Sequence, residues 1–184
     1  VDLGGNVPIV GTQFSQELWI YPQQLDDAWH GFFGYQDPLT LGGIKRPPSI
    51  WLWQRTRIHD GFGDGSRWYS TNSSSVLKER DWNHVATTFD GSSYKLYVNG
   101  NEVHSYLGAS NQTPISLPIR WIGKVDNSFK GKIDEVRVWN IAKSGEKIKS
   151  QMKIPLSGRE DGLIGYWNFD AGNAKDLSDN MNDG

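Results

Sequence analysis

The sequence contains no cysteine and no long run of apolar residues. Without cysteine, disulfide scaffolds, thiol enzymes and cysteine-ligated zinc or iron–sulfur sites are excluded. No apolar segment approaches the roughly 18 residues that a membrane-spanning helix needs, and the first residues lack the pattern of a signal peptide. We therefore expect no membrane insertion. An extracellular location stays open, because a core of this size does not depend on disulfides.

An excess of charge of one sign is also missing. The chain has 19 Lys+Arg and 21 Asp+Glu, which leaves a formal net charge of −2. Proteins that bind nucleic acids or anionic membrane surfaces need a basic excess, so we expect neither partner. The 184 residues fit a single domain over residues 1–184, with a polar C-terminal tail over residues 170–184. Because the chain begins with VDL, which resembles the inside of a folded module, we expect a piece of a larger protein.

Turn-forming and aromatic residues are abundant instead. The chain has 21 Gly and 9 Trp, and tryptophan favours strands. Apolar and polar residues alternate in short runs, as in half-buried strands. Asn99-Gly100 separates two such runs and favours a type I′ hairpin turn. Strands are expected over residues 13–21, 29–35, 50–58, 67–71, 76–78, 82–90, 94–98, 102–106, 119–123, 131–139 and 163–169.

One helix is expected, over residues 144–152. Ser144 can cap its first turn, and Glu146 suits the positive end of the helix dipole. Ile148 and Met152 lie four residues apart on one face. The whole pattern predicts an all-β protein, a two-sheet antiparallel sandwich with one short helix near the C-terminus.

Two motifs carry a family resemblance. The string DWNHVA (residues 81–86), followed by DG (90–91) and KLYVNG (95–100), resembles the core of laminin-G-like domains. The string FKGKIDEVRVWN (129–140), preceded by IG (122–123), resembles a second hallmark of these domains. The resemblance implies a concanavalin-A-like lectin/glucanase jelly roll of the laminin-G/pentraxin branch.

The C-terminal part departs from the family pattern. Residues 165–170 and 182–184 resemble the sequence that precedes VDLG in family members, here at the opposite end of the chain. In tandem arrays such a sequence opens the next repeat. We favour the alternative that the strand at residues 163–169 closes the present domain, because a bare sheet edge invites aggregation.

Catalysis is not expected. Jelly-roll glucanases place carboxylates at alternate positions of one strand, because acid and nucleophile must point into one cleft about 5–5.5 Å apart. Asp134 and Glu135 are adjacent, so on a regular strand they point to opposite faces. The apolar alternation also changes phase here, which predicts a bulge, or an acid tied to Arg137 or to a backbone turn.

A calcium site is one candidate for function. Ca²⁺ prefers several oxygen ligands from loops, and the family resemblance implies one ion at the rim of the sandwich. Asp37, Asp126 and Asn127 are the set we favour, with Asp60 and Asp64 or the acids of the tail as alternatives. The predicted cofactor is therefore Ca²⁺.

A sugar-binding face is the other candidate. Trp51, Trp53, Arg55 and Arg57 lie on one face of the strand predicted over residues 50–58, opposite Ile50, Leu52 and Ile58. Sugars stack on aromatic rings, while arginine reaches hydroxyl or acidic groups. Glu17 and Trp19 would join the same site if their strand belonged to the same sheet. The alternative is that loops cover these rings as a second layer of core.

The sequence thus predicts a non-catalytic carbohydrate-binding or adhesion module of a larger secreted or cell-surface protein. Its partner would be a glycan or an extracellular protein. Two alternatives stay open, a protein–protein recognition module of laminin-G type and a glycanase or polysaccharide lyase with an unrecognised site.

Overall fold

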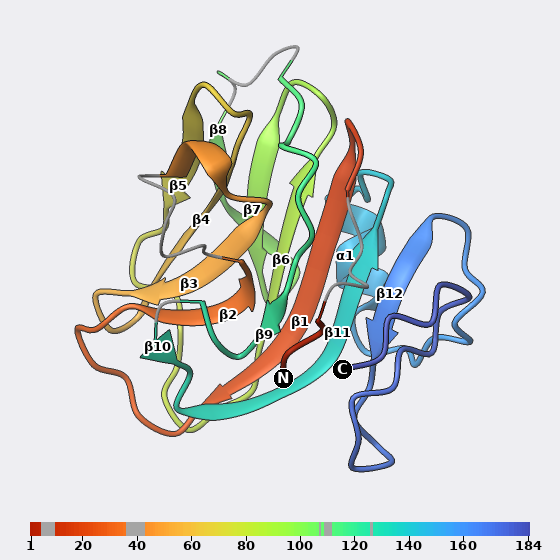
Figure 1. Ribbon diagram of the computed structural model, residues 1–184. Helices are drawn as coiled ribbons and strands as arrows, with labels where there is room; N and C mark the ends of the chain where they lie inside the picture. The colour runs from red at the N-terminus through yellow and green to blue at the C-terminus, as the bar shows by residue number, and fades with distance from the viewer. Residues whose placement is uncertain (5–9, 36–42, 107, 109–111, 126) are drawn as a thin grey trace.

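The computed structural model describes residues 1–4, 10–35, 43–106, 108, 112–125 and 127–184 (Figure 1). Within these residues, two β-sheets enclose a shared apolar core. One α-helix, α1 (Gly145–Gln151), lies near the C-terminal end, and a 3-10 turn, η1 (Gly43–Lys45), precedes the second sheet's central strands. The predicted all-β jelly-roll sandwich with one short helix near the C-terminus is confirmed.

Sheet I follows the order β12-β11-β1-β6-β7-β8, and all its neighbouring strands run antiparallel. Its central strand is β1, which lies between β11 and β6. The strands are β1 (Phe14–Pro22), β6 (Asn83–Phe89), β7 (Tyr94–Val98), β8 (Asn101–Tyr106), β11 (Gly131–Trp139) and β12 (Leu163–Trp167).

Sheet II follows the order β10-β2-β3-β4-β5, and β9 also pairs with β2. Its strands pair antiparallel, except that β10 runs parallel to β2 over two residues. The strands are β2 (His30–Gly34), β3 (Ser49–Trp53), β4 (Arg57–Gly63), β5 (Trp68–Asn72), β9 (Trp121–Ile122) and β10 (Asn127–Ser128). Figure 1 shows this sheet stacked on sheet I.

The core fills the space between the sheets. Alternate residues of each strand point inward, so that Leu18 of β1 and Leu52 of β3 are completely buried while their neighbours Trp19 and Trp53 stay half-buried outside. Each fully buried apolar side chain contributes about 1.5–3 kcal/mol. The fully buried members of the core include Phe14, Ile20, Ile50, Ile58, Phe62, Val85, Phe89, Leu96, Val136 and Val138.

A β-bulge interrupts β11 where the sequence changes phase. Glu17 of β1 faces Arg137, but Trp19 faces Asp134, so two residues of β11 lie opposite one residue of β1. Glu135 adopts a left-handed backbone conformation at the bulge, with φ of 52°. The predicted bulge is present, and so is the predicted tie between an acid and Arg137, which forms an ion pair with Glu135.

The strand near the C-terminus belongs to sheet I. β12 pairs with β11, and its Trp167 side chain is completely buried in the core. The segment after β12 folds back along it (Figure 1), and the Trp167 Nε1–H group donates to the Asn182 carbonyl over 3.2 Å. Asp176 is 1% exposed although it lies in the polar tail.

Candidate functional site

The structure divides the predicted ligand-binding residues between the two sheets. Trp51, Trp53 and Arg57 belong to β3 and β4 of sheet II, whereas Glu17 and Trp19 belong to β1 of sheet I. The outer faces of the two sheets lie on opposite sides of the sandwich. The prediction that Glu17 and Trp19 join the same site required their strand to belong to the same sheet, and it does not.

Glu17 is an internal ion-pair partner on the outer face of sheet I. Its Oε1 atom lies 2.7 Å from Nζ of Lys143, and its Oε2 atom lies 3.5 Å from Nε2 of His84. Burial by itself raises the pKa of Glu17, but the hydrogen bonds and charges of His84 and Lys143 lower it to about 2. Because its carboxylate is completely buried and occupied, Glu17 cannot contact a glycan.

Aromatic side chains gather on the outer face of sheet II, and we call this surface the aromatic face. It joins Trp29, which precedes β2, to residues of β3, β4 and β5. The Trp29 ring lies 5.8 Å from the ring of Trp53 and 5.1 Å from that of His59. Its further members are Trp51, Trp68, Arg46 and Arg57.

The rings of the aromatic face differ in exposure. Trp51 is completely buried, with the Trp68 ring 6.1 Å away and the Arg46 guanidinium 5.2 Å from its centroid. Trp29 is 38% exposed, and Trp53 is half-buried. Trp51 is thus part of a second packed layer, as the alternative interpretation expected, whereas Trp29 and Trp53 present ring surface to solvent.

The single strand predicted over residues 50–58 is wrong: the chain turns between Trp53 and Arg57 and forms the β3–β4 hairpin, where the two arginines of the predicted set lie. Gln54 and Arg55 close the hairpin with φ angles of 44° and 67°, and Arg55 is exposed at the turn. The Arg57 guanidinium lies 5.7 Å from the ring centroid of Trp53. Arg57 therefore presents its N–H donors beside an aromatic ring, an arrangement suited to hydroxyl or carboxylate acceptors.

A hollow of about 350 Å³ opens on the aromatic face, lined by Trp29, Arg46, His59 and Asn127. Asn127 donates a hydrogen bond from Nδ2 to the Trp29 carbonyl over 2.9 Å. The rim and the aromatic face, which were alternative sites at the level of sequence, therefore meet at Asn127. Asp37 and Asp126, the other two predicted metal ligands, lie outside the described residues. Within the described part of the chain, no three His, Asp or Glu residues form a metal-binding group, and the calcium site stays a prediction.

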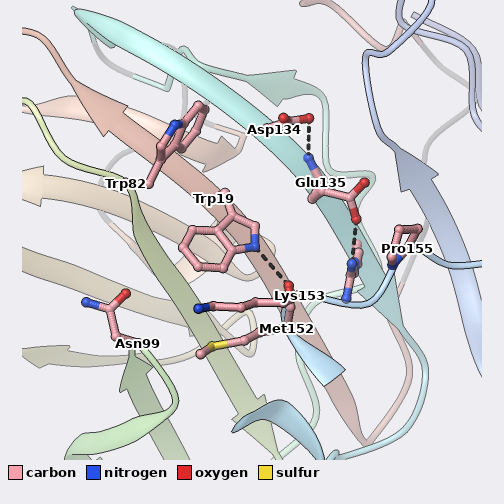
Figure 2. Close-up of a pocket in the computed structure, with 9 residues that line it drawn as sticks. Trp19, Trp82, Asn99, Asp134, Glu135, Met152, Lys153 and Pro155 are labelled. Carbon is pink, nitrogen blue, oxygen red and sulfur yellow. Dashed lines mark hydrogen bonds and ion pairs between the residues drawn. The ribbon is translucent and has the colours of Figure 1, made fainter. Parts of the chain in front are cut away.

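A second hollow, of about 660 Å³, lies on the outer face of sheet I, and we call it the Trp19 hollow. Figure 2 shows the indole rings of Trp19 and Trp82 on one side and the carboxylates of the β11 bulge on the other. Its lining residues are Trp19, Trp82, Asn99, Asp134, Glu135, Arg137, Met152, Lys153 and Pro155. Sequence reasoning missed this hollow, although it had identified the change of phase at Asp134 and Glu135 that marks it.

The two carboxylates of the bulge have different surroundings. Glu135 is held by Arg137 and by the Tyr166 hydroxyl, which donates to it over 2.8 Å. Asp134 accepts the Glu135 backbone N–H at its Oδ1 atom over 2.9 Å, and burial raises the pKa of Asp134. Both carboxylates line the hollow, but that of Glu135 is already bound by the Arg137 and Tyr166 side chains.

The fold and these surfaces define a two-sheet jelly-roll sandwich with a hollow on each outer face. Residues 1–149 match the model of the concanavalin A-like lectin/glucanases superfamily, and the chain belongs to this family. No curated protein matches the sequence. In the described residues, none of the helices has the length and apolar character needed to cross a membrane.

Many solved structures, among them the following three, are similar to this chain. A Bacteroides ovatus protein to which carbohydrate binding has been ascribed has 20% identity and a TM-score of 0.69 over 86% of this chain and 46% of its own. Domain 4 of AbnA, a GH43 extracellular arabinanase from Geobacillus stearothermophilus in complex with arabinotriose, has 26% identity and a TM-score of 0.59 over 77% and 67%. The CBM40 of a Ruminococcus gnavus IT-sialidase, bound to α2,3-sialyllactose, has 16% identity and a TM-score of 0.63 over 75% and 81%. The present chain thus spans less than half of the Bacteroides protein.

Proposed function

We propose that the chain is a non-catalytic carbohydrate-binding module of a larger secreted or cell-surface protein, and that a glycan binds on its aromatic face. The observation that carries the proposal is the ring of Trp29, 38% exposed beside Trp53 and at the edge of a hollow. An exposed indole in a hollow is suited to the apolar C–H face of a sugar ring.

Polar groups beside Trp29 supply the hydrogen bonds that a sugar also needs. Arg57, which lies over the Trp53 ring, offers a planar set of donors for two neighbouring hydroxyls or for a sugar carboxylate. Asn127 lines the hollow from β10. A few fixed polar groups around an apolar surface are typical of specific small-molecule sites.

Similar structures support the same proposal. Domain 4 of the arabinanase is 26% identical to this chain and was solved with arabinotriose. The Ruminococcus CBM40 was solved with α2,3-sialyllactose. A fold of this type hosts several functions, so the weight of the proposal rests on the aromatic face.

The surroundings of Asp134 and Glu135 support a non-catalytic role. A glycosidase needs one carboxylic acid and one carboxylate on either side of the scissile bond. Glu135 is occupied by Arg137 and Tyr166, so only Asp134 is left for such a reaction at the Trp19 hollow. We therefore expect no release of reducing ends from polysaccharides.

A glycan array tests the proposal. The labelled chain is applied with calcium and, in parallel, with a chelator, and the Trp29→Ala variant is applied beside it. We expect signals on a defined group of glycans that Trp29→Ala weakens. Loss of the same signals in chelator would show that binding needs a divalent cation, for which Asp37, Asp126 and Asn127 are the predicted ligands. If the folded chain binds no glycan in either buffer, the carbohydrate proposal fails and protein recognition becomes the leading hypothesis.

A further inference from the structure

We propose that the Trp19 hollow is a second glycan site, on the side of the sandwich opposite the aromatic face, and that it takes a neutral sugar unit. This inference extends the proposed carbohydrate binding, but it does not require the aromatic face to be occupied. The volume of about 660 Å³ lies within the range of about 300–1,000 Å³ that is common for small-molecule sites.

The two indole rings are held in place by contacts with the protein. Nε1–H of Trp19 donates to the Met152 carbonyl over 2.9 Å, and the His84 ring lies 5.2 Å from the Trp19 ring. Trp82 is 39% exposed and has the Tyr21 ring 5.6 Å away, edge-on. Because these contacts already fix the rings, binding a sugar costs little additional ordering of side chains.

The polar groups of the hollow include both donors and acceptors. Asn99 Oδ1 accepts the His84 backbone N–H over 2.9 Å, which directs the Asn99 amino group away from that contact. Asp134 uses Oδ1 for the Glu135 N–H and keeps its second oxygen as an acceptor at the hollow. Lys153, an exposed cation, lies across from it (Figure 2). Sugar hydroxyls donate and accept at once, so this mixed set matches them.

The charges of the hollow favour neutral sugars. The Glu135 and Arg137 side chains form an ion pair, and Arg137 is 1% exposed. The charges that remain toward the hollow, Asp134 and Lys153, have opposite signs. Because these two charges balance, the hollow has no excess of positive charge that would select an anionic sugar over a neutral one.

The bulge of β11 gives the two adjacent acids, Asp134 and Glu135, different contacts. On a regular strand, Asp134 and Glu135 would point to opposite faces. The left-handed conformation of Glu135 lets its carboxylate reach Arg137 and Tyr166 while Asp134 stays beside Trp19, its partner in the register. A residue other than glycine in this conformation carries backbone strain, and such strain is concentrated at binding and active sites.

Titration of the ¹⁵N-labelled chain, followed through its tryptophan indole signals, tests the inference. The probes are arabinotriose, maltotriose, cellotriose and chitotriose. Trp29 and Trp82 form a matched pair, since they are 38% and 39% exposed on opposite faces. We expect at least one probe to shift the Trp19 and Trp82 signals in the parent and in Trp29→Ala. Trp82→Ala should weaken that binding by about tenfold.

The remaining outcomes separate the two sites. Shifts confined to Trp29 and Trp53 would overturn the second site and leave the proposed function intact. Shifts at Trp19 that disappear in Trp29→Ala would also overturn it, because they would report a change transmitted from the aromatic face. If no probe shifts the Trp19 and Trp82 signals, the inference fails, whatever the glycan array shows.

Discussion

Nζ of Lys143 lies 2.7 Å from Oε1 of Glu17, and the two side chains are 2% and 0% exposed. Lys143 also lies over the Trp139 ring, 4.1 Å from its centroid, and its backbone N–H donates to Ser15 over 2.8 Å. The segment between β11 and α1 is therefore fastened to β1 by a buried ion pair. This contact explains why Glu17 is completely buried although its side chain points away from the core between the sheets.

Replacing Glu17 by Gln should destabilise the fold strongly. The change leaves the Lys143 ammonium buried without its counter-charge, and breaking a buried pair in this way costs about 3–5 kcal/mol. The exposed pair of Lys95 and Glu102, 3.1 Å apart, provides the control, because Glu102→Gln should cost less than about 1 kcal/mol. Urea unfolding measures both free energies. Equal losses in the two variants would mean that the buried Glu17 pair contributes no more to stability than the exposed pair of Lys95 and Glu102.

Acidic pH should remove the contribution of the Glu17 carboxylate to the stability of the fold. Its pKa is lowered to about 2 in the folded protein, against a usual value of 4.5. Between pH 4.5 and about 2 the folded state therefore binds fewer protons than the unfolded state, so stability falls as the pH decreases below about 4.5. Unfolding free energies at pH 6 and pH 3 should differ less in Glu17→Gln than in the parent. An unchanged difference would assign the acid sensitivity to other groups.

Asp60 should make the fold less stable as the pH rises, which is the opposite of the effect of Glu17. This residue of β4 is completely buried, and Thr71 donates a hydrogen bond to it. Burial raises its pKa from 3.8 to about 7. Between pH 3.8 and about 7 the folded state keeps a proton that the unfolded state has lost. Stability should therefore fall as the pH rises through this range, by up to about 1.4 kcal/mol for each pH unit.

The Asp60→Asn variant isolates this effect. Urea unfolding at pH 5 and pH 8 should show a smaller difference for the variant than for the parent, because the variant lacks the carboxyl group at position 60. A pH dependence that is the same in the two proteins would show that Asp60 is ionised in the folded state throughout this range.

Asp176 should fasten the C-terminal segment to β12. Its carboxylate accepts hydrogen bonds from the backbone N–H groups of Tyr166, Ser178 and Asn182, each over 2.8–2.9 Å. Asp176→Ala leaves these buried donors without acceptors, at about 1–3 kcal/mol for each one. We expect faster hydrogen exchange over residues 168–184. Asp179→Ala, at an exposed position, is the control, and equal exchange in both variants would contradict the role of Asp176.

Local features of the fold could be predicted because they depend on neighbours in sequence. Asn99 and Gly100 have φ angles of 50° and 75°, as the predicted hairpin turn requires. Ser144 caps α1 by accepting the Lys147 N–H over 3.3 Å. The bulge at Glu135 was visible as a change in the apolar alternation. Each of these signals lies within a few residues of the feature it predicts.

The arrangement of the candidate site depends on pairings between distant residues, and alternation along one strand does not specify them. Trp19 and Trp53 each follow an inward-facing residue in the same way, yet their strands belong to different sheets. The partner of Glu17 lies 126 residues further along the chain. Trp29 was not included in the predicted set, because its contact with Trp53 arises only when β2 pairs with β3.

The central claim is that a glycan stacks on Trp29. The most direct measurement uses the glycan that binds best on the array among those that leave the Trp19 and Trp82 indole signals unshifted. It is titrated by calorimetry into the parent, Trp29→Ala and Trp82→Ala, after circular dichroism has shown that all three are folded. Loss of one stacking ring should weaken binding by about three- to tenfold in Trp29→Ala, while Trp82→Ala keeps the parent's affinity for that glycan. Equal affinities for the parent and Trp29→Ala would contradict the claim.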